Sequence, residues 1–261
     1  MQFKISPLLI IIWVQPAHET LLELLACRTC YISEIIDLEG PPADQLCFWC
    51  QSQQGYFRCK SCFSQALLCR SCCFTIHHHA PLHHIEKWTG KFFNATSLNQ
   101  EGFILYLGHG GEPCPASHTG RDGKEAQLGS SDEDDGERED ESNGVPLAAW
   151  EKQDKHCLVI VDTSGVHQLC IGWCQCTTAA EPHIQLLRSR LFPATIKRPS
   201  TAFTFSLLDY FHIDSVECKT SASSFFSKLC RLTNNSNPHS VPVCRIIFCK
   251  SYQANRYLEP V

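Results

Sequence analysis

The apolar positions of the chain change their spacing along its length, and each spacing predicts a different element. Residues 157–162 and 166–173 are rich in β-branched and other apolar residues, and the turn-forming Thr163-Ser164-Gly165 separates them. Two such runs around a short turn predict a β hairpin. A shorter apolar run at residues 103–107 predicts one more strand.

Helical spacing dominates after the predicted hairpin. From Pro182 onward Ile184, Leu187 and Leu191 fall on one helix face, and Pro193 would end that helix. A second helix is predicted after Pro199-Ser200, with Ser200 as its cap and an apolar stripe of Phe203, Leu207, Leu208 and Phe211. A third is predicted over residues 221–232. Such stripes indicate helix-packing core.

The N-terminal segment gives two alternatives. Residues 7–14 are apolar after one lysine, as in a signal peptide, but the run is short and no small-residue cleavage motif lies nearby. It is also too short to span a membrane. The amphipathic pattern of residues 20–25 follows directly. We therefore predict a packed lead-in helix or strand, and no membrane association.

An acidic run interrupts the chain. Residues 132–141 contain eight acidic side chains and one arginine, a charge of 1 − 8 = −7. Such a run cannot bury apolar surface, and we expect disorder. Because the whole chain carries −5, the remainder carries +2. A nearly neutral folded part argues against a strongly basic nucleic-acid binder.

Cysteine and histidine are the unusual feature of the composition, with 18 and 13 residues in a chain of 261. A chain of this length can bury a core without covalent staples. Many of the cysteines are two residues apart and close to histidines. Disulfides do not use histidine, whereas Zn²⁺ binds thiolate and imidazole together in tetrahedral sites. The spacing therefore favours zinc over disulfides.

The densest cluster supplies eight candidate ligands, enough for two tetrahedral zinc ions. Their order suits a cross-braced arrangement, in which the first and third pairs share one ion, although sequential pairing stays open. His78, His79 or His84 could replace the nominated histidines. Cys27 and Cys30, which lie upstream, are expected to be free or buried thiols. The predicted ligands are Cys47, Cys50, Cys69 and Cys72 for one ion, and Cys59, Cys62, His77 and His83 for the other.

A third zinc site is predicted from residues on either side of the acidic run. His109 and Cys114 precede that run, and Cys174 and Cys176 follow it. A shared ion would bring the two ends of the long insertion together, which makes its length tolerable. Four unrelated residues near strand ends are the alternative. None of the three sets leaves an open coordination position, which a catalytic zinc requires.

These elements predict an α+β fold: a zinc-stabilised, cross-braced module of the B-box or RING type, a small β hairpin and a C-terminal helical segment. The expected domains are a helical lead-in over 1–45, the zinc-binding cluster over 46–115, and an acidic disordered insertion over 116–156. The hairpin, residues 157–181, completes the cysteine cluster domain. A helical segment over 182–235 and a divergent tail over 236–261 follow.

Several motifs taken together resemble one family. They are the order of the cysteine cluster, Pro81-Leu-His-His-Ile-Glu-Lys-Trp, Leu107-Gly-His109, Val161-Asp-Thr-Ser-Gly-Val-His167, Cys174-x-Cys176, Leu191-Phe-Pro-Ala-Thr195 and Phe211-His212. From about residue 47 to 235 the chain resembles the CxC2-like cysteine cluster domain associated with KDZ transposases in fungi. The resemblance implies a mobile-element context and a nuclear, DNA-related role. The acidic run and the tail depart from the family pattern.

Three functional classes compete. Asp162 ends an apolar strand, as in a nuclease core, with Asp209, Asp214 or Glu217 as possible companions, but only one hairpin surrounds it. We therefore expect no enzyme activity and no small-molecule substrate, and no transposase catalytic domain in this chain. We expect a binding protein in the nucleus, or otherwise the cytoplasm. Its partner would be DNA or a transposase subunit, or another protein bound by a B-box or RING-like module, unless the chain is a transposon relic.

Overall fold

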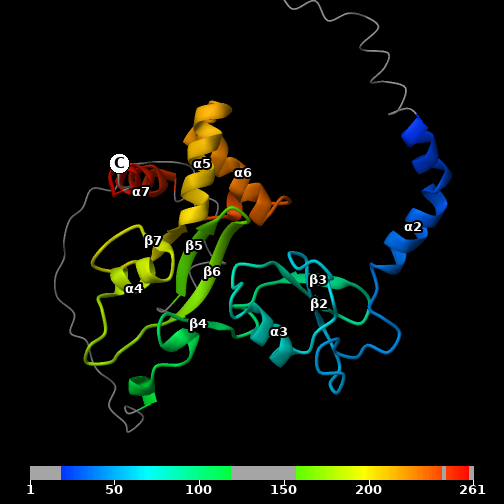
Figure 1. Ribbon diagram of the computed structural model, residues 1–261, viewed down its shortest axis with the longest axis horizontal. Helices are drawn as coiled ribbons and strands as arrows, with labels where there is room; N and C mark the ends of the chain where they lie inside the picture. Colours follow the sequence, from blue (N-terminus) through cyan, green and yellow to red (C-terminus); the bar gives the residue numbers. More distant parts are fainter. Residues whose placement is uncertain (1–18, 119–156, 243–244, 259–261) are drawn as a thin grey trace, which may run out of the picture. The chain divides into compact units, whose positions relative to one another are not determined.

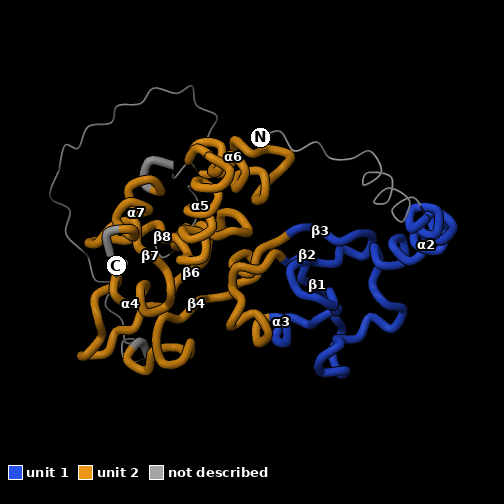
Figure 2. Tube along the Cα trace, turned by 45° about the horizontal axis from the view of Figure 1, so that its top comes forward, with its two compact units in different colours: residues 1–73, 85–95 blue, residues 74–84, 96–261 orange. Residues whose placement is uncertain are grey.

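The computed structural model describes residues 19–118, 157–242 and 245–258, and it combines helices with two separate sheets (Figure 1). The apolar run at residues 7–14 and the acidic run at residues 132–141 lie outside the described part. The chain divides into two compact units, drawn in different colours in Figure 2. Unit 1 comprises residues 1–73 and 85–95, and unit 2 comprises residues 74–84 and 96–261.

Unit 1 is built on a small sheet with the order β1-β2-β3, formed by β1 (Phe57–Cys59), β2 (Ile85–Trp88) and β3 (Phe93–Thr96). β1 and β2 are antiparallel, and Arg58 lies opposite Glu86. The Nε of Arg58 donates to Oε2 of Glu86 at 2.8 Å, and its guanidinium lies 3.9 Å from the ring centroid of Phe93. This largely buried ion pair joins β1 and β2.

The described part of the predicted lead-in, residues 19–45, is mainly helical but does not show the predicted packing. Residues 19–26 are helical, and α2 (Arg28–Asp37) follows. Neither segment has a buried side chain, and Leu25, Ile35 and Ile36 are among the exposed apolar residues. No described helix combines the length and the apolar composition needed to cross a membrane.

Unit 2 contains a five-stranded mixed sheet with the order β4-β6-β5-β8-β7. Its strands are β4 (Ile104–Tyr106), β5 (Cys157–Asp162), β6 (Gly165–Gly172), β7 (Leu191–Pro193) and β8 (Thr201–Thr204). β5 pairs antiparallel with β6, with Asp162 opposite Gly165, so the predicted hairpin is confirmed. β4 runs parallel to β6, and β8 runs parallel to β5.

The hairpin is therefore the centre of a larger sheet, which corrects the expectation of a hairpin followed by helices alone. α4 (Pro182–Arg188) ends before Leu191, which starts β7 instead of continuing the helical stripe. Phe203 lies in β8, and α5 (Phe205–Glu217) begins later than predicted. Its cap is Thr204, whose hydroxyl accepts from the N–H of Leu207, and not Ser200. Strand pairing with β5 explains the difference, because it removes residues 201–204 from the helix.

α6 (Ala222–Thr233) agrees with the predicted third helix. The hydroxyl of Ser221 accepts from the N–H of Ser224 at 3.1 Å, which caps the first turn. Its apolar face buries Phe225, Phe226 and Leu229. α3 (Arg70–His77) and the 3₁₀ turns η1 (His109–Gly111), η2 (Pro115–His118) and η3 (Pro238–Ser240) complete the elements before the C-terminal helix.

The core of unit 2 is aromatic and includes a residue of the predicted tail. Phe248 belongs to α7 (Arg245–Leu258) and is fully buried. Its ring stacks on that of Phe225 at 5.8 Å between centroids and lies 5.4 Å from that of Phe203. Full burial of each such side chain stabilises the fold by roughly 1.5–3 kcal/mol. The tail thus contributes to the main core.

Candidate metal centres

The first group of candidate ligands lies within unit 1. The sulfurs of Cys47, Cys50, Cys69 and Cys72 all lie within 4.8 Å of one another. The sulfurs of Cys50 and Cys69 are 4.0 Å apart. Tetrahedral zinc with bonds of about 2.3 Å holds its sulfurs about 3.8 Å apart. The donor set and its spacing fit a four-thiolate zinc site.

Local backbone structure aims these thiols at one point. The N–H of Gln51 donates to the carbonyl of Cys47 at 2.9 Å, and Gln51 takes a positive φ of 53°, so the first two ligands lie within one tight turn. Cys69 directly precedes α3, and Cys72 lies in its first turn. The N-terminal end of a helix favours negative charge, which stabilises thiolates there.

The pKa values of this group diverge. The hydroxyl of Ser52 chiefly lowers the pKa of Cys50 to about 6. At Cys69 burial opposes ionisation, but hydrogen bonds led by that of Ser71 outweigh it and lower the pKa. Burial and the neighbouring thiols raise the pKa of Cys72 to about 12. Several thiolates at one point repel one another, and a bound cation removes that repulsion.

The second predicted set is divided between the units. Cys59 and Cys62 belong to unit 1, where Cys59 ends β1 and is buried. Burial is the main cause that raises the pKa of Cys59 to about 11. His77 and His83 belong to unit 2, with ring centroids 5.4 Å apart. His77 is fully buried, and burial followed by the charge of His77 lowers the pKa of His83. Low pKa values keep imidazole neutral, the form that binds metal.

His78 and His84, the alternatives to the nominated histidine ligands, make contacts with backbone carbonyls. The Nε2 of His78 lies 3.0 Å from the carbonyl oxygen of Gly111. The Nε2 of His84 lies 3.0 Å from the carbonyl oxygen of Ser164. These contacts with backbone carbonyls orient both rings within unit 2. Cys27 and Cys30 are exposed on the N-terminal helical segment.

The third group lies within unit 2 and brings together the residues on either side of the acidic run. The donor atoms of His109, Cys114, Cys174 and Cys176 lie within 4.8 Å of one another. The sulfur of Cys114 is 3.7 Å from that of Cys176 and 4.0 Å from that of Cys174. The Nε2 of His109 is 3.3 Å and 3.5 Å from the sulfurs of Cys174 and Cys176. Tetrahedral zinc requires about 3.8 Å between sulfurs and slightly less from sulfur to nitrogen.

Tight backbone turns place His109 in this group. His109, Gly110 and Gly111 have φ values of 51°, 69° and 93°, three successive left-handed residues. Glycine adopts such values without strain. Gly108 has little room for a side chain, because an added Cβ would lie 3.1 Å from the Cβ of Cys174. The two glycines and the close approach explain the Gly108-His109-Gly110-Gly111 sequence.

Gln185 is a positioning residue that sequence reasoning missed. It belongs to α4 and is buried. Its Oε1 accepts from the N–H of Cys174 at 2.9 Å, and its Nε2 donates to the carbonyls of Cys174 at 3.1 Å and Ala180 at 2.8 Å. Both backbone groups of Cys174 are thus fixed by one amide. The predicted apolar face of this helix was Ile184, Leu187 and Leu191, so the sequence pattern carried no signal for Gln185.

The thiols of the third group also have opposite pKa shifts. The N–H of Gln175 donates to the sulfur of Cys114 at 3.3 Å and is the main cause that lowers the pKa of Cys114 to about 6. The neighbouring thiols of Cys114 and Cys174 raise the pKa of Cys176 to about 11. As in the first group, crowded thiols favour a shared cation.

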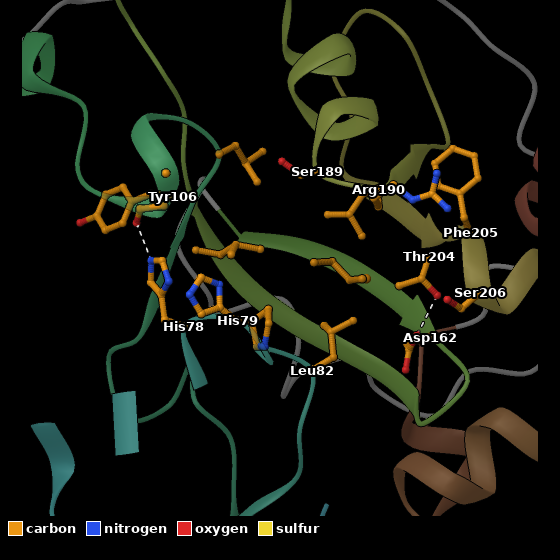
Figure 3. Close-up of a pocket in the computed structure, with 17 residues that line it drawn as sticks. His78, His79, Leu82, Tyr106, Asp162, Ser189, Arg190, Thr204, Phe205 and Ser206 are labelled. Atoms are coloured by element: carbon orange, nitrogen blue, oxygen red, sulfur yellow. Dashed lines mark hydrogen bonds between the residues drawn. The ribbon is translucent and has the colours of Figure 1, made fainter. Parts of the chain in front are cut away.

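A cavity of about 430 Å³ lies in unit 2 between β5, β4 and the start of α5. Figure 3 shows Asp162 and Thr204 pointing toward one another near Arg190, and His78 lying farther along the pocket. The guanidinium of Arg190 lies 4.8 Å from the ring centroid of Phe205. Asp162, Thr204 and Arg190 thus line one end of the cavity, and His78 lines the part farther along.

Asp162 has a structural environment. Its Oδ2 accepts from the hydroxyl of Ser164 at 2.7 Å and from the Ser164 N–H at 3.1 Å, and its Oδ1 accepts from the hydroxyl of Thr204 at 2.7 Å. Burial alone would raise the pKa of Asp162, but these hydrogen bonds outweigh it and lower the pKa below 3.8. Among the described residues no carboxylate joins Asp162 in a group that could hold a metal ion. The carboxylate ties the hairpin turn to β8.

Comparison with known proteins identifies part of the chain. The family model described as "CxC2 like cysteine cluster associated with KDZ transposases" matches residues 145–237. No curated protein and no solved structure matches the sequence. The predicted resemblance is confirmed over that range, which includes Cys174, Cys176 and Gln185. It does not extend to the first two ligand sets, so these depend on their own spacing and geometry.

Proposed function

We propose that this chain is a zinc-stabilised, non-catalytic accessory protein that binds DNA in a mobile-element context. Residues 145–237 match a cysteine cluster domain that accompanies KDZ transposases, and the observation that carries the zinc assignment is the convergence of His109, Cys114, Cys174 and Cys176. Two of these four ligands lie inside the matched range. In this proposal no residue of the chain has a catalytic role.

Zinc is the metal that best suits the donors. Mixed thiolate and imidazole ligands in sets of four are typical of structural Zn²⁺, whose coordination they fill. We assign one ion to Cys47, Cys50, Cys69 and Cys72, and one to the third group. A second cross-braced ion held by Cys59, Cys62, His77 and His83 is supported by their spacing and donor chemistry.

The charge around the cluster supports DNA as the partner. Residues 47–95 contain five basic side chains and one acidic one, which gives 5 − 1 = +4. Among the basic residues Lys60 has a side chain that is 60% exposed, and its Nζ lies 3.4 Å from Oε1 of Glu86. Lysine and arginine contact phosphates without reading sequence, so this surface would bind DNA weakly and with a strong salt dependence. A nuclear location follows from the proposal.

A mobility-shift titration of the zinc-loaded full chain on duplex DNA tests the proposed DNA binding. We expect a shift whose affinity falls steeply between about 50 mM and 200 mM salt. Lys60→Gln combined with Lys87→Gln should weaken binding at every salt concentration and reduce its salt dependence. The matched control is Lys219→Gln, a basic residue of unit 2. A zinc-loaded protein that shifts no DNA at high micromolar concentration would remove DNA from the proposal.

Exposed aromatic residues favour a second candidate, a protein partner such as a transposase subunit. Phe48, Trp49 and Phe63 of unit 1 are 62%, 66% and 107% exposed. Exposed aromatic side chains are enriched at protein interfaces. Co-purification with a KDZ transposase that is lost in Trp49→Ala and Phe63→Ala, but kept in the lysine variant, would select this candidate over DNA.

A further inference from the structure

Two cysteines outside the predicted ligand sets face one another across the central hairpin. Cys157 is the first residue of β5, and Cys170 lies directly opposite it in β6. Their sulfurs are 2.8 Å apart. Both side chains are half-buried, so a small solute can reach them. Neither belongs to a group that could hold a metal ion among the described residues.

This geometry is close to that of a disulfide. An S–S bond is about 2.05 Å long, so the sulfurs need to approach by less than about 1 Å. Residues directly opposite in an antiparallel pair have Cβ atoms near the range that a disulfide allows. Side-chain rotation and a small change in strand spacing are therefore enough to form the bond.

We propose that Cys157 and Cys170 are a thiol-oxidation site that forms a reversible cross-strand disulfide with hydrogen peroxide as the oxidant. One thiolate attacks the peroxide oxygen, which breaks the O–O bond and gives a sulfenic acid and water. The second thiolate then attacks the sulfenic sulfur, and the hydroxyl group leaves as water. Two thiols and one hydrogen peroxide give one disulfide and two waters. A small dithiol reverses the reaction by exchange.

The Cys157–Cys170 disulfide would join β5 and β6 at the end of the hairpin that is distant from the turn. At the turn, hydrogen bonds from Ser164 to Asp162 already fix the chain as it leaves β5, and Asp162 is paired with Gly165 of β6. The Cys157–Cys170 pair lies at the opposite end of the hairpin. Four residues beyond Cys170 the chain reaches Cys174 of the third ligand group. Oxidation would therefore fix the strand end that leads into this group.

The two kinds of cysteine should differ in their reactivity. A thiolate bound to a cation has its negative charge neutralised, and it cannot attack a peroxide as readily as a free thiolate. The Cys157–Cys170 pair has its partner sulfur in place, which gives the second step a high effective concentration. In the zinc-loaded protein this pair should oxidise before the ligand cysteines.

Peptide mass spectrometry of the zinc-loaded full chain tests the site. The protein is treated with limiting hydrogen peroxide, alkylated, and digested with trypsin and an aspartate-specific protease that cuts before Asp162. The digest separates residues 156–161, which hold Cys157, from residues 162–188, which hold Cys170, Cys174 and Cys176. We expect these two peptides to become cross-linked, with fragment ions that place the bond at Cys170, and dithiothreitol to release them.

Cysteine variants and measured zinc content show whether the cross-link joins Cys157 to Cys170 and leaves the metal groups intact. Cys170→Ser should abolish the cross-link, whereas Cys218→Ser, which changes an exposed cysteine at the end of α5, should leave it unchanged. Zinc content measured in the same samples should stay constant while the cross-link forms. The proposal is overturned if Cys157 remains alkylated while zinc is released, or if Cys157 cross-links to Cys174 or Cys176.

Discussion

At the scale of single residues, a hydrogen-bond relay fixes the turn of the central hairpin. The hydroxyl of Ser164 donates to Asp162 at 2.7 Å, so its one proton is used there. The Nε2 of His167 lies 2.9 Å from the same oxygen and must be the donor. Nε2 of His167 therefore carries a proton, and burial, which lowers the pKa of His167 to about 4, favours the neutral ring at pH 7. Protonation of its other nitrogen would place a charge in a largely buried position beside His84.

This relay predicts acid sensitivity. Burial, with a smaller contribution from His84, lowers the pKa of His167 from 6.5 to about 4. Between these values the unfolded chain binds a proton that the folded protein does not, so stability falls as pH falls through this window. From pH 7 to pH 5 we expect a loss of about 2 kcal/mol from this residue.

Urea unfolding of the wild type and His167→Gln at both pH values measures that loss. Glutamine can still donate to Ser164 but does not titrate, so its stability should fall less on acidification. An equal fall in the two proteins would show that other groups cause the acid sensitivity. Circular dichroism at pH 7 checks that the variant is folded.

Gly165 is a second residue whose identity the hairpin requires. It has a φ of 137°, and an added Cβ would lie 2.7 Å from the hydroxyl of Thr233. That hydroxyl accepts from the N–H of Val166 at 2.7 Å. Gly165→Ala should cost about 1–3 kcal/mol through backbone strain and displacement of Thr233. Thermal unfolding measures the cost, with Gly90→Ala as a control that has the same kind of φ but open space around it.

At the scale of elements, pairing and capping decided where helices begin. Thr204 ends β8, caps α5 and donates to Asp162, so one residue joins a strand, a helix and the hairpin turn. Ser200 is equally suited to capping by its chemistry. The parallel pairing of β8 with β5 excluded it, because residues 201–204 became a strand.

α4 shows how one element supports a metal group without supplying a ligand. Gln185→Leu should keep the helix and its volume but leave the backbone N–H and carbonyl of Cys174 without this partner. We expect a stability loss of about 2 kcal/mol or more, and weaker zinc retention at the third group. Competition with a chromophoric chelator measures the retention.

Gln175→Leu is the matched control for that experiment. Gln175 neighbours two ligands but has an exposed side chain, and its contact with Cys114 uses the backbone N–H. Zinc retention in this variant should equal that of the wild type. Equal loss in both variants would refute the positioning role of Gln185.

At the scale of the whole molecule, we expect metal to stabilise mainly unit 1 and the aromatic core to stabilise mainly unit 2. Unit 2 has an aromatic core that includes Phe203, Phe225 and Phe248, whereas the sheet of unit 1 has three short strands. A structural zinc ion can supply folding free energy on the order of 10 kcal/mol. Unit 1 should therefore depend on metal more strongly than unit 2.

Native mass spectrometry with and without a chelator tests this dependence. We expect close to three zinc ions per chain and one fewer in Cys114→Ser. Cys69→Ser should lose at least one ion, and a second if the unfolding of unit 1 also displaces Cys59 and Cys62. Cys69→Ser should unfold unit 1, seen as faster amide exchange in β1 and β2, while the β5–β8 pairing stays protected. Two ions in the wild type would remove one proposed site, and disulfides in place of zinc would overturn the metal assignment.

The sequence by itself determined the donor chemistry and the central hairpin. Ligand pairs have short, repeated spacings, and a hairpin is a local structure of alternating residues around a turn, so both can be read from neighbouring positions. The convergence of His109 and Cys114 with Cys174 and Cys176 was also predictable, because both pairs flank one long insertion. The mixed α and β class followed from the same local patterns.

Only the tertiary structure decided the rest, because it depends on contacts between distant residues. The parallel pairing of β8 with β5 turned a predicted helix start into a strand, and the burial of Phe248 brought the C-terminal tail into the core. Gln185 reaches Cys174 only because α4 folds back against the end of β6. The facing thiols of Cys157 and Cys170 likewise follow from strand register, which spacing of cysteines alone does not specify.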